Sequence, residues 1–253
     1  MLVGAQCYTV RAYTQNERDF SETMRRVAAM GYRSVQLSAY GPIAPQKLRN
    51  ICDKYELSIV LTHYDPRRVV EDTDAVIAEH TILGCDYIGI GSMPDRYRNA
   101  WWMPRFFEDF TPAAQKIRDA GKLLMYHNHH FEWNRLPDGQ LMIDALLSGM
   151  PADLMGVTLD TYWVQAAGAD LYEWIEKLKG RIPCVHFKDM AIHGNEQRMA
   201  AVGDGNLRFD KIIEKLSAQG GTKHVLVEQD DCYGEDPFAC LERSLRCLKG
   251  FGL

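Results

Sequence analysis

The sequence lacks the features that mark membrane, secreted and nucleic-acid-binding proteins. It has no run of about 18 uninterrupted apolar residues, so we expect no membrane-spanning segment. Its first residues, MLVGAQCYTV, carry neither a basic start nor a long apolar stretch, so we expect no secretory signal. With 29 basic and 34 acidic residues the net charge is −5, which argues against a nucleic acid partner.

Common cysteine and glycine motifs are also missing. The seven cysteines form no CxxC or CxxH pair, and their odd number argues against a disulfide framework. We therefore expect buried free thiols in a cytoplasmic protein. Neither GxGxxG nor GxxxxGK(S/T) is present, which disfavours an open sheet that binds a dinucleotide and also a P-loop.

Eight short apolar segments alternate with longer amphipathic ones. The short segments are rich in β-branched and aromatic residues, which is typical of strands. They lie at 2–10, 33–40, 57–64, 86–92, 122–129, 154–161, 182–189 and 223–230. Between them, apolar residues recur at helical spacing, as in Phe20, Met24 and Val27. Gly31 and Gly84 follow such segments, where a helix C-cap favours a residue that adopts positive φ.

This alternation predicts right-handed βαβ units and a parallel sheet. Eight such units in 253 residues are the number that closes a (β/α)8 barrel. We therefore predict an α/β fold with one TIM barrel domain over residues 1–253. The longest irregular segment is expected at about 190–206, between the seventh strand and the seventh helix.

Polar residues concentrate at the C-terminal ends of the predicted strands, where a barrel of this kind places its active site. They are Gln6, Tyr8, Gln36, Ser38, His63, His127, Asn128, His129, His130, Glu132, Asp160, His186, Lys188, Asp189, Glu228, Gln229, Asp230 and Asp231. Mixed Asp, Glu and His ligands suit one divalent cation such as Mn²⁺, Co²⁺, Mg²⁺, Fe²⁺ or Zn²⁺. The pattern therefore predicts a metal site at this rim.

Several of these residues have simpler alternative roles. Asp160 also suits a helix N-cap, and His186 also suits a buried core histidine. Lys188 and Asp189 also suit a structural ion pair. A lone buried carboxylate at Glu228 would be costly without a cation or partner, which favours a functional role there.

Eight segments, in order along nearly the whole chain, resemble one known superfamily. They are GAQCYTVR, GYRSVQLS, LGCDYIGI, YHNHHFEW, LDTYWVQAAG, VHFKDM, VGDGN and LVEQDD. Together they resemble the sugar phosphate isomerase/epimerase superfamily of xylose isomerase-like TIM barrels. Its relatives include ketose 3-epimerases, inosose dehydratase, lyases that process 3-oxo-glycosides, and endonuclease IV.

The resemblance implies one divalent metal ion held by four side chains from strands five to eight. It assigns Asp160, His186 and Glu228 as ligands. The chain departs from the ketose epimerases at strand five, where their glutamate is replaced by His127. Either His127 binds the metal, or Glu132 completes the set, and we favour Glu132.

The resemblance also implies roles for other rim residues. We expect Glu228, His129 and Lys188 to be catalytic. We expect substrate contacts from a second group: His63, Gln36, Trp163 and His127. Aromatic rings such as Trp163 suit the apolar faces of sugars.

The implied function is a metal-dependent isomerase or epimerase that abstracts a proton next to a carbonyl of a ketose or keto-sugar. The alternative is a lyase or dehydratase that performs β-elimination on a 3-oxo-sugar, 3-oxo-glycoside or inosose. A metal-free sugar-binding or regulatory barrel and an endonuclease IV-like enzyme are further alternatives. We expect a small sugar substrate, no nucleic acid or membrane partner, and a homo-oligomer, either a dimer or a tetramer.

Overall fold

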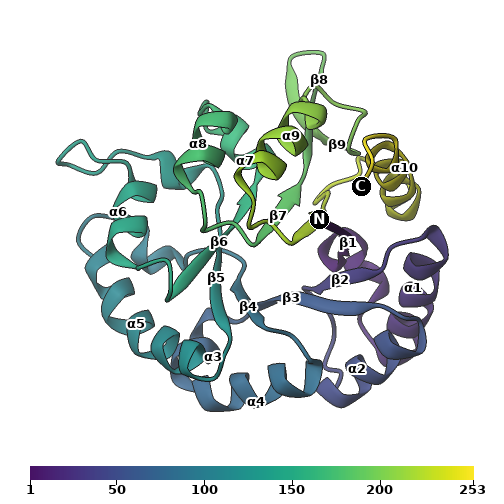
Figure 1. The fold of residues 1–253 in the computed structure, drawn as a ribbon, viewed down its shortest axis with the longest axis horizontal. Helices are drawn as coiled ribbons and strands as arrows, with labels where there is room; N and C mark the ends of the chain where they lie inside the picture. The colour runs from purple at the N-terminus through teal and green to yellow at the C-terminus, as the bar shows by residue number, and fades with distance from the viewer.

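Eight parallel strands close into one barrel in the computed structural model, which describes residues 1–253 (Figure 1). The strands are β1 (Leu2–Gln6), β2 (Ser34–Leu37), β3 (Ser58–Tyr64), β4 (Tyr87–Ile90), β5 (Leu123–His127), β6 (Met155–Asp160), β7 (Cys184–Phe187) and β10 (His224–Val227). Each pairs with its neighbours in chain order, and β1 pairs with β10 in parallel to close the ring. The fold is the (β/α)8 barrel that the sequence predicts.

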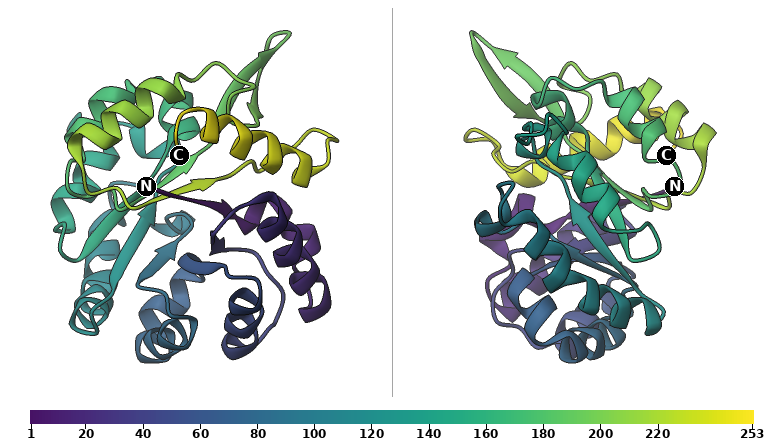
Figure 2. Two further views of the ribbon diagram at one scale, coloured as in Figure 1. Left: turned by 45° about the vertical axis from the view of Figure 1, so that its right-hand side comes forward. Right: turned by 90° about the vertical axis from the view of Figure 1, so that its left-hand side faces the viewer.

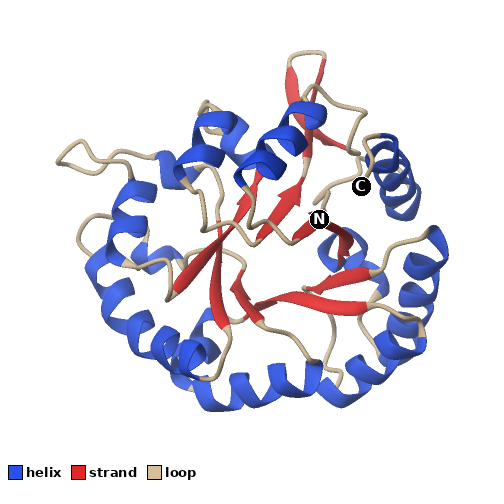
Figure 3. Ribbon diagram, viewed as in Figure 1, coloured by secondary structure: helices blue, strands red, loops and turns tan.

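Helices form a ring outside the strands (Figure 3). The α-helices are α1 (Glu17–Met30), α2 (Pro45–Lys54), α3 (Pro66–Glu71), α4 (Thr73–Leu83), α5 (Met103–Asp119), α6 (Met142–Gly149), α7 (Thr161–Ala166), α8 (Leu171–Lys177), α9 (Phe209–Gln219) and α10 (Pro237–Gly250). Short 3-10 helices are η1 (Cys7–Tyr13), η2 (Asp95–Tyr97) and η3 (Phe131–Trp133). None of the helices combines the length and apolar composition needed to cross a membrane.

Local sequence signals set the ends of α1. The side chain of Asn16 accepts a hydrogen bond from Asp19 N at 3.0 Å and so caps the first turn. Gly31 ends the helix with φ of 109°, a left-handed conformation that favours glycine. The face between these ends buries Phe20, Met24 and Val27, the stripe identified in the sequence.

The barrel interior is built in layers. Residues from different strands pack together there as a small apolar cluster, which includes Leu61, Met125, Cys184 and Leu226. Side chains alternate between the two faces of a strand, so the residue two positions further on points the same way. Those residues are His63, His127, His186 and Glu228. The apolar cluster therefore lies beneath a polar layer at the C-terminal rim.

Two segments differ from the sequence prediction. The first strand ends at Gln6 rather than at residue 10, because the chain turns into η1 and the Gln6 side chain accepts from Tyr8 N at 3.3 Å. The segment expected to be irregular forms an antiparallel hairpin of β8 (Asp189–His193) and β9 (Glu196–Ala200), which projects from the barrel (Figure 2). The sequence did not predict these strands, because a hairpin whose outer residues are exposed needs no alternation of apolar and polar residues.

A substitution at Gly89 in β4 would measure how tightly neighbouring strands pack at the rim. A Cβ at this position would lie 2.2 Å from the carbonyl oxygen of Thr62, so backbone would have to move. We expect Gly89→Ala to lower the free energy of unfolding by about 1–3 kcal/mol, as overpacked sites do. Urea denaturation measures this. The control is Gly250→Ala, because nothing lies within 4 Å of that added Cβ, and an equal loss in both variants would contradict the packing argument.

Candidate metal centre and active site

Four buried side chains converge at the C-terminal rim of the barrel. They are His127 at the end of β5, Asp160 at the end of β6, His186 in β7 and Glu228 directly after β10. Each contributes one potential ligand atom, and all four atoms lie within 4.8 Å of one another. Three of these residues are among the ligands expected from the sequence.

The two oxygens of Asp160 have different roles. Oδ1 accepts from Trp163 N at 3.0 Å and caps α7. Oδ2 faces the cluster, 3.2 Å from His127 Nε2 and 3.0 Å from Lys188 Nζ. Asp160 therefore belongs both to the helix cap and to the candidate site, since the hydrogen bond that caps α7 also orients its second oxygen. Burial favours the neutral acid, but Lys188 and His127 outweigh it and lower the pKa of Asp160.

Both histidines present one ring nitrogen to the cluster and bond through the other. His186 Nε2 donates to Gln36 Oε1 at 2.6 Å, which leaves Nδ1 at 2.9 Å from Glu228 Oε2. His127 Nδ1 donates to the carbonyl oxygen of Gly91 at 2.8 Å, which leaves Nε2 facing Asp160. Metal-binding histidines are held in this way.

This donor set fits a divalent metal ion. In the tautomers set by Gln36 and Gly91, nitrogen lone pairs face carboxylate oxygens, and a proton or a metal cation must lie between them. Burial disfavours a proton on either ring, and it lowers the pKa of His186. At His127 the hydrogen bond and charge of Asp160 outweigh burial and raise the pKa. A metal ion would replace that proton.

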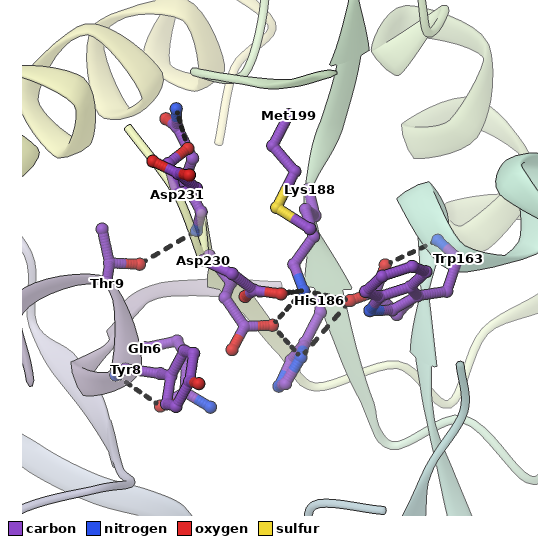
Figure 4. A network of polar contacts seen from close by, with 12 residues as sticks. Gln6, Tyr8, Thr9, Trp163, His186, Lys188, Met199, Asp230 and Asp231 are labelled. Carbon is purple, nitrogen blue, oxygen red and sulfur yellow. Dashed lines mark hydrogen bonds and ion pairs between the residues drawn. The ribbon is translucent and has the colours of Figure 1, made fainter. Parts of the chain in front are cut away.

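Lys188 lies at the centre of the negative charge (Figure 4). Its Nζ is 2.9 Å from Glu228 Oε2, 2.9 Å from Asp230 Oδ1 and 3.0 Å from Asp160 Oδ2, and the side chain is 1% exposed. Burial favours the neutral amine, but the three carboxylates outweigh it and raise the pKa of Lys188. The charge of Lys188, together with His186, outweighs burial at Glu228 and holds the pKa of Glu228 well below its usual value.

Glu132, which the sequence analysis favoured as the strand-five ligand, is not in this group. Its Oε1 accepts from the hydroxyl of Tyr126 at 2.7 Å and its Oε2 accepts from His129 N at 2.8 Å. The carboxylate therefore ties the turn after β5 to the strand itself. Burial raises the pKa of Glu132 to about 7. The structure brings His127, the alternative, to the cluster instead.

The other expected residues fall into two groups. His63 and His129 line the cavity above the cluster. Burial and neighbouring charge lower the pKa of His129 to about 2 and that of His63 well below its usual value, so both rings are neutral. Gln36 and Trp163 are not on the cavity wall. Gln36 holds His186 from behind, and the Trp163 ring packs 5.2 Å from the His129 ring, between centroids.

A cavity of about 740 Å³ opens above the cluster. Glu228, His127 and Lys188 form part of its wall, together with residues from the segments after β3 and β4. This volume is in the range of small-molecule sites. Glu228 and His127 are thus accessible to a ligand of sugar size.

The family of xylose isomerase-like TIM barrels matches residues 24–250. The chain belongs to this family. It resembles a sugar phosphate isomerase/epimerase from Parabacteroides distasonis, with a TM-score of 0.83 and 24% identity over 98% of this chain and 93% of the other. An L-ribulose 3-epimerase structure matches with a TM-score of 0.75 and 17% identity over 100% of this chain and 95% of the other.

A curated relative of this xylose isomerase-like chain is named for a different reaction. It is an inosose dehydratase of Lacticaseibacillus casei, 21% identical over 88% of this chain and 86% of the relative. The family resemblance expected from the sequence is therefore confirmed. Both isomerase or epimerase chemistry and dehydratase chemistry occur among its relatives.

Sequence reasoning assigned no role to several cavity residues. Asp230, which contacts Lys188, had a signal, since it lies in the polar run that ends strand eight. Arg67, Arg96 and Arg98 lie in loops and helix starts rather than at strand ends, so the strand-end pattern did not mark them.

We expect His127→Ala to bind the metal at least about tenfold more weakly than the native protein, because it removes a ligand atom. Asp160→Asn should also lower occupancy. Glu132→Gln should retain the metal, since that side chain bonds only to the Tyr126 hydroxyl and to the backbone of His129. Elemental mass spectrometry of each purified variant measures this. Loss of metal in Glu132→Gln with retention in His127→Ala would return the ligand role to Glu132.

Proposed function

We propose that this protein is a metal-dependent sugar isomerase or epimerase that removes a proton from the carbon next to a carbonyl of a ketose or keto-sugar. The observation that carries the proposal is the convergence of His127, Asp160, His186 and Glu228 at the base of a sugar-sized cavity. The resemblance to an L-ribulose 3-epimerase structure supports this choice.

Glu228 is the proposed base. Its carboxylate lies on the cavity wall and is ionised, because Lys188 and His186 hold its pKa down. The carboxylate takes the proton from carbon, and the electron pair of the C–H bond moves towards the carbonyl oxygen. A divalent cation held by the four donors would polarise that oxygen as a Lewis acid. Lys188 supplies fixed positive charge beside the same carboxylate.

Return of the proton completes the reaction. Return of this proton to the former carbonyl carbon, with transfer of the neighbouring hydroxyl proton to the former carbonyl oxygen, gives isomerisation. Delivery of a proton to the opposite face of the original carbon gives epimerisation. His129 is on the cavity wall, and its neutral ring can hydrogen-bond to and orient the substrate hydroxyl or water that carries this proton. His63 is placed for contact with a sugar hydroxyl.

A second candidate is β-elimination from a 3-oxo-sugar, 3-oxo-glycoside or inosose. The observation that favours it is His127 at the strand-five position, where the two-glutamate epimerases carry a carboxylate. With one carboxylate base at Glu228, a histidine or Lys188 would protonate the departing oxygen while the C–O bond breaks. The inosose dehydratase relative supports this candidate.

The experiment is isotope exchange at carbon. Native protein with added Mn²⁺ or Co²⁺ is incubated in D2O with a panel of ketoses and 3-oxo-glycosides, and NMR follows deuterium at the carbon next to the carbonyl. Deuterium in recovered sugar or in its isomer supports isomerisation or epimerisation, and loss of a leaving group supports elimination. No exchange with any member, together with sugar binding, would favour a metal-free binding barrel.

Glu228→Gln should lower the exchange rate at least about 100-fold at saturating metal, because it removes the base. The control is Asp231→Asn, an exposed carboxylate three residues further on that is not on the cavity wall. It should exchange at the native rate. A near-native rate in a folded Glu228→Gln variant would contradict the assignment of the base.

The expectations of a homo-oligomer and of a cytoplasmic location stay predictions. The preference for a small sugar over nucleic acid rests on the cavity size and on the net charge of −5.

A further inference from the structure

The outer part of the cavity wall is rich in arginine. Arg67 comes from α3, directly after β3, and Arg96 and Arg98 come from the segment that follows β4. Asp65 is the acidic residue on the same stretch of wall. In a chain with a net charge of −5, three guanidinium groups on one cavity wall are a local excess of positive charge. The metal centre does not use them.

Arg98 is held in place by its surroundings. Nε donates to the carbonyl oxygen of Met93 at 2.8 Å, Nη2 donates to Ser92 Oγ at 2.8 Å, and Nη1 lies 2.9 Å from Asp95 Oδ1. The guanidinium carbon lies 4.1 Å from the centroid of the Phe131 ring. These contacts use three of the five N–H groups and fix the plane of the fork. One N–H on each terminal nitrogen is left for a ligand.

The acidic partners of these arginines are weak competitors for a ligand. Arg67 and Glu71 are 3.4 Å apart, with side chains 72% and 62% exposed. Arg96 and Asp109 are 3.7 Å apart. Asp95, the partner of Arg98, is 88% exposed. Water screens ion pairs of this kind, so an oxyanion inside the cavity can replace them as a partner.

A row of packed aromatic rings connects Arg98 with the candidate metal centre. The Phe131 ring under Arg98 stacks on His129 at 5.8 Å between centroids, and the His129 ring is 4.8 Å from that of His127. The rings of Phe131 and His129 therefore lie between Arg98 and the candidate ligand His127. The arginines and Glu228 line the same cavity, so one ligand could contact both.

We propose that the wall formed by Arg67, Arg96 and Arg98 binds an oxyanion substituent of the sugar, a phosphate ester or a carboxylate. The proposal rests on the proposed function, because it assigns the substrate class of the same site. Guanidinium groups match the geometry of both oxyanions through paired N–H donors. Neutral ketoses would lack this anchor and bind more weakly.

The test compares charged and neutral sugars by isothermal titration calorimetry at constant ionic strength. The pairs are fructose 6-phosphate with fructose, and glucuronate with glucose. We expect the charged member of at least one pair to bind at least about tenfold more tightly, as charge-assisted hydrogen bonds do. Which pair shows the preference distinguishes phosphate from carboxylate. Equal affinity within both pairs would overturn the proposal.

Variants locate the preference on the wall. Arg96→Gln and Arg98→Gln should each reduce the preference at least about threefold, and the double variant should abolish it. Arg96 is 62% exposed, so its replacement tests the site even if Arg98→Gln disturbs the loop. The control is Arg18→Gln, whose side chain is 89% exposed on α1 and should have no effect. A preference that survives in the Arg96 and double variants would overturn the proposal.

Isotope exchange on the same preparations separates this proposal from the proposed reaction. Exchange without any preference for charged sugars would contradict the oxyanion site and support the proposed reaction. An arginine-dependent preference without exchange would contradict the proposed reaction and support the oxyanion site.

Discussion

The apolar cluster in the barrel interior supports the polar side chains of the candidate site. Leu61, Met125, Cys184 and Leu226 come from different strands and pack together as one buried cluster. Alternation along each strand then fixes the direction of the residue two positions further on. A parallel barrel brings all strand C-termini to one rim, so residues far apart in sequence converge without any loop having to position them.

Charge balance is the second requirement of the site. Asp160, Glu228 and Asp230 surround Lys188, and each carboxylate would be costly to bury alone. The ammonium group of Lys188 helps to lower the pKa of Asp160 and of Glu228, so both carboxylates stay ionised. Burial and the charge of Glu228 raise the pKa of Asp230 to about 6. The arrangement therefore keeps Glu228 ionised although its side chain is only 4% exposed.

The strand-five position shows how local hydrogen bonds decide which side chain joins the candidate site. Glu132 is close enough in sequence to favour the turn after β5, and its carboxylate satisfies Tyr126 and the backbone of His129. His127 is in the strand itself, so the pleat directs it into the barrel. Its Nδ1 is occupied by Gly91, a residue of the neighbouring β4 segment that no local pattern connects with it.

The sequence by itself determined the eight strand–helix units, the glycines that end α1 and α4, and the strand-end positions of Asp160, His186 and Glu228, because periodicity and caps are local properties of the chain. Only the tertiary structure decided that His127 and not Glu132 joins them. It also decided that Gln36 supports His186, and that Arg67, Arg96 and Arg98 share one wall. These outcomes depend on contacts between distant segments, where hydrogen-bond partners and burial are set by packing rather than by sequence spacing.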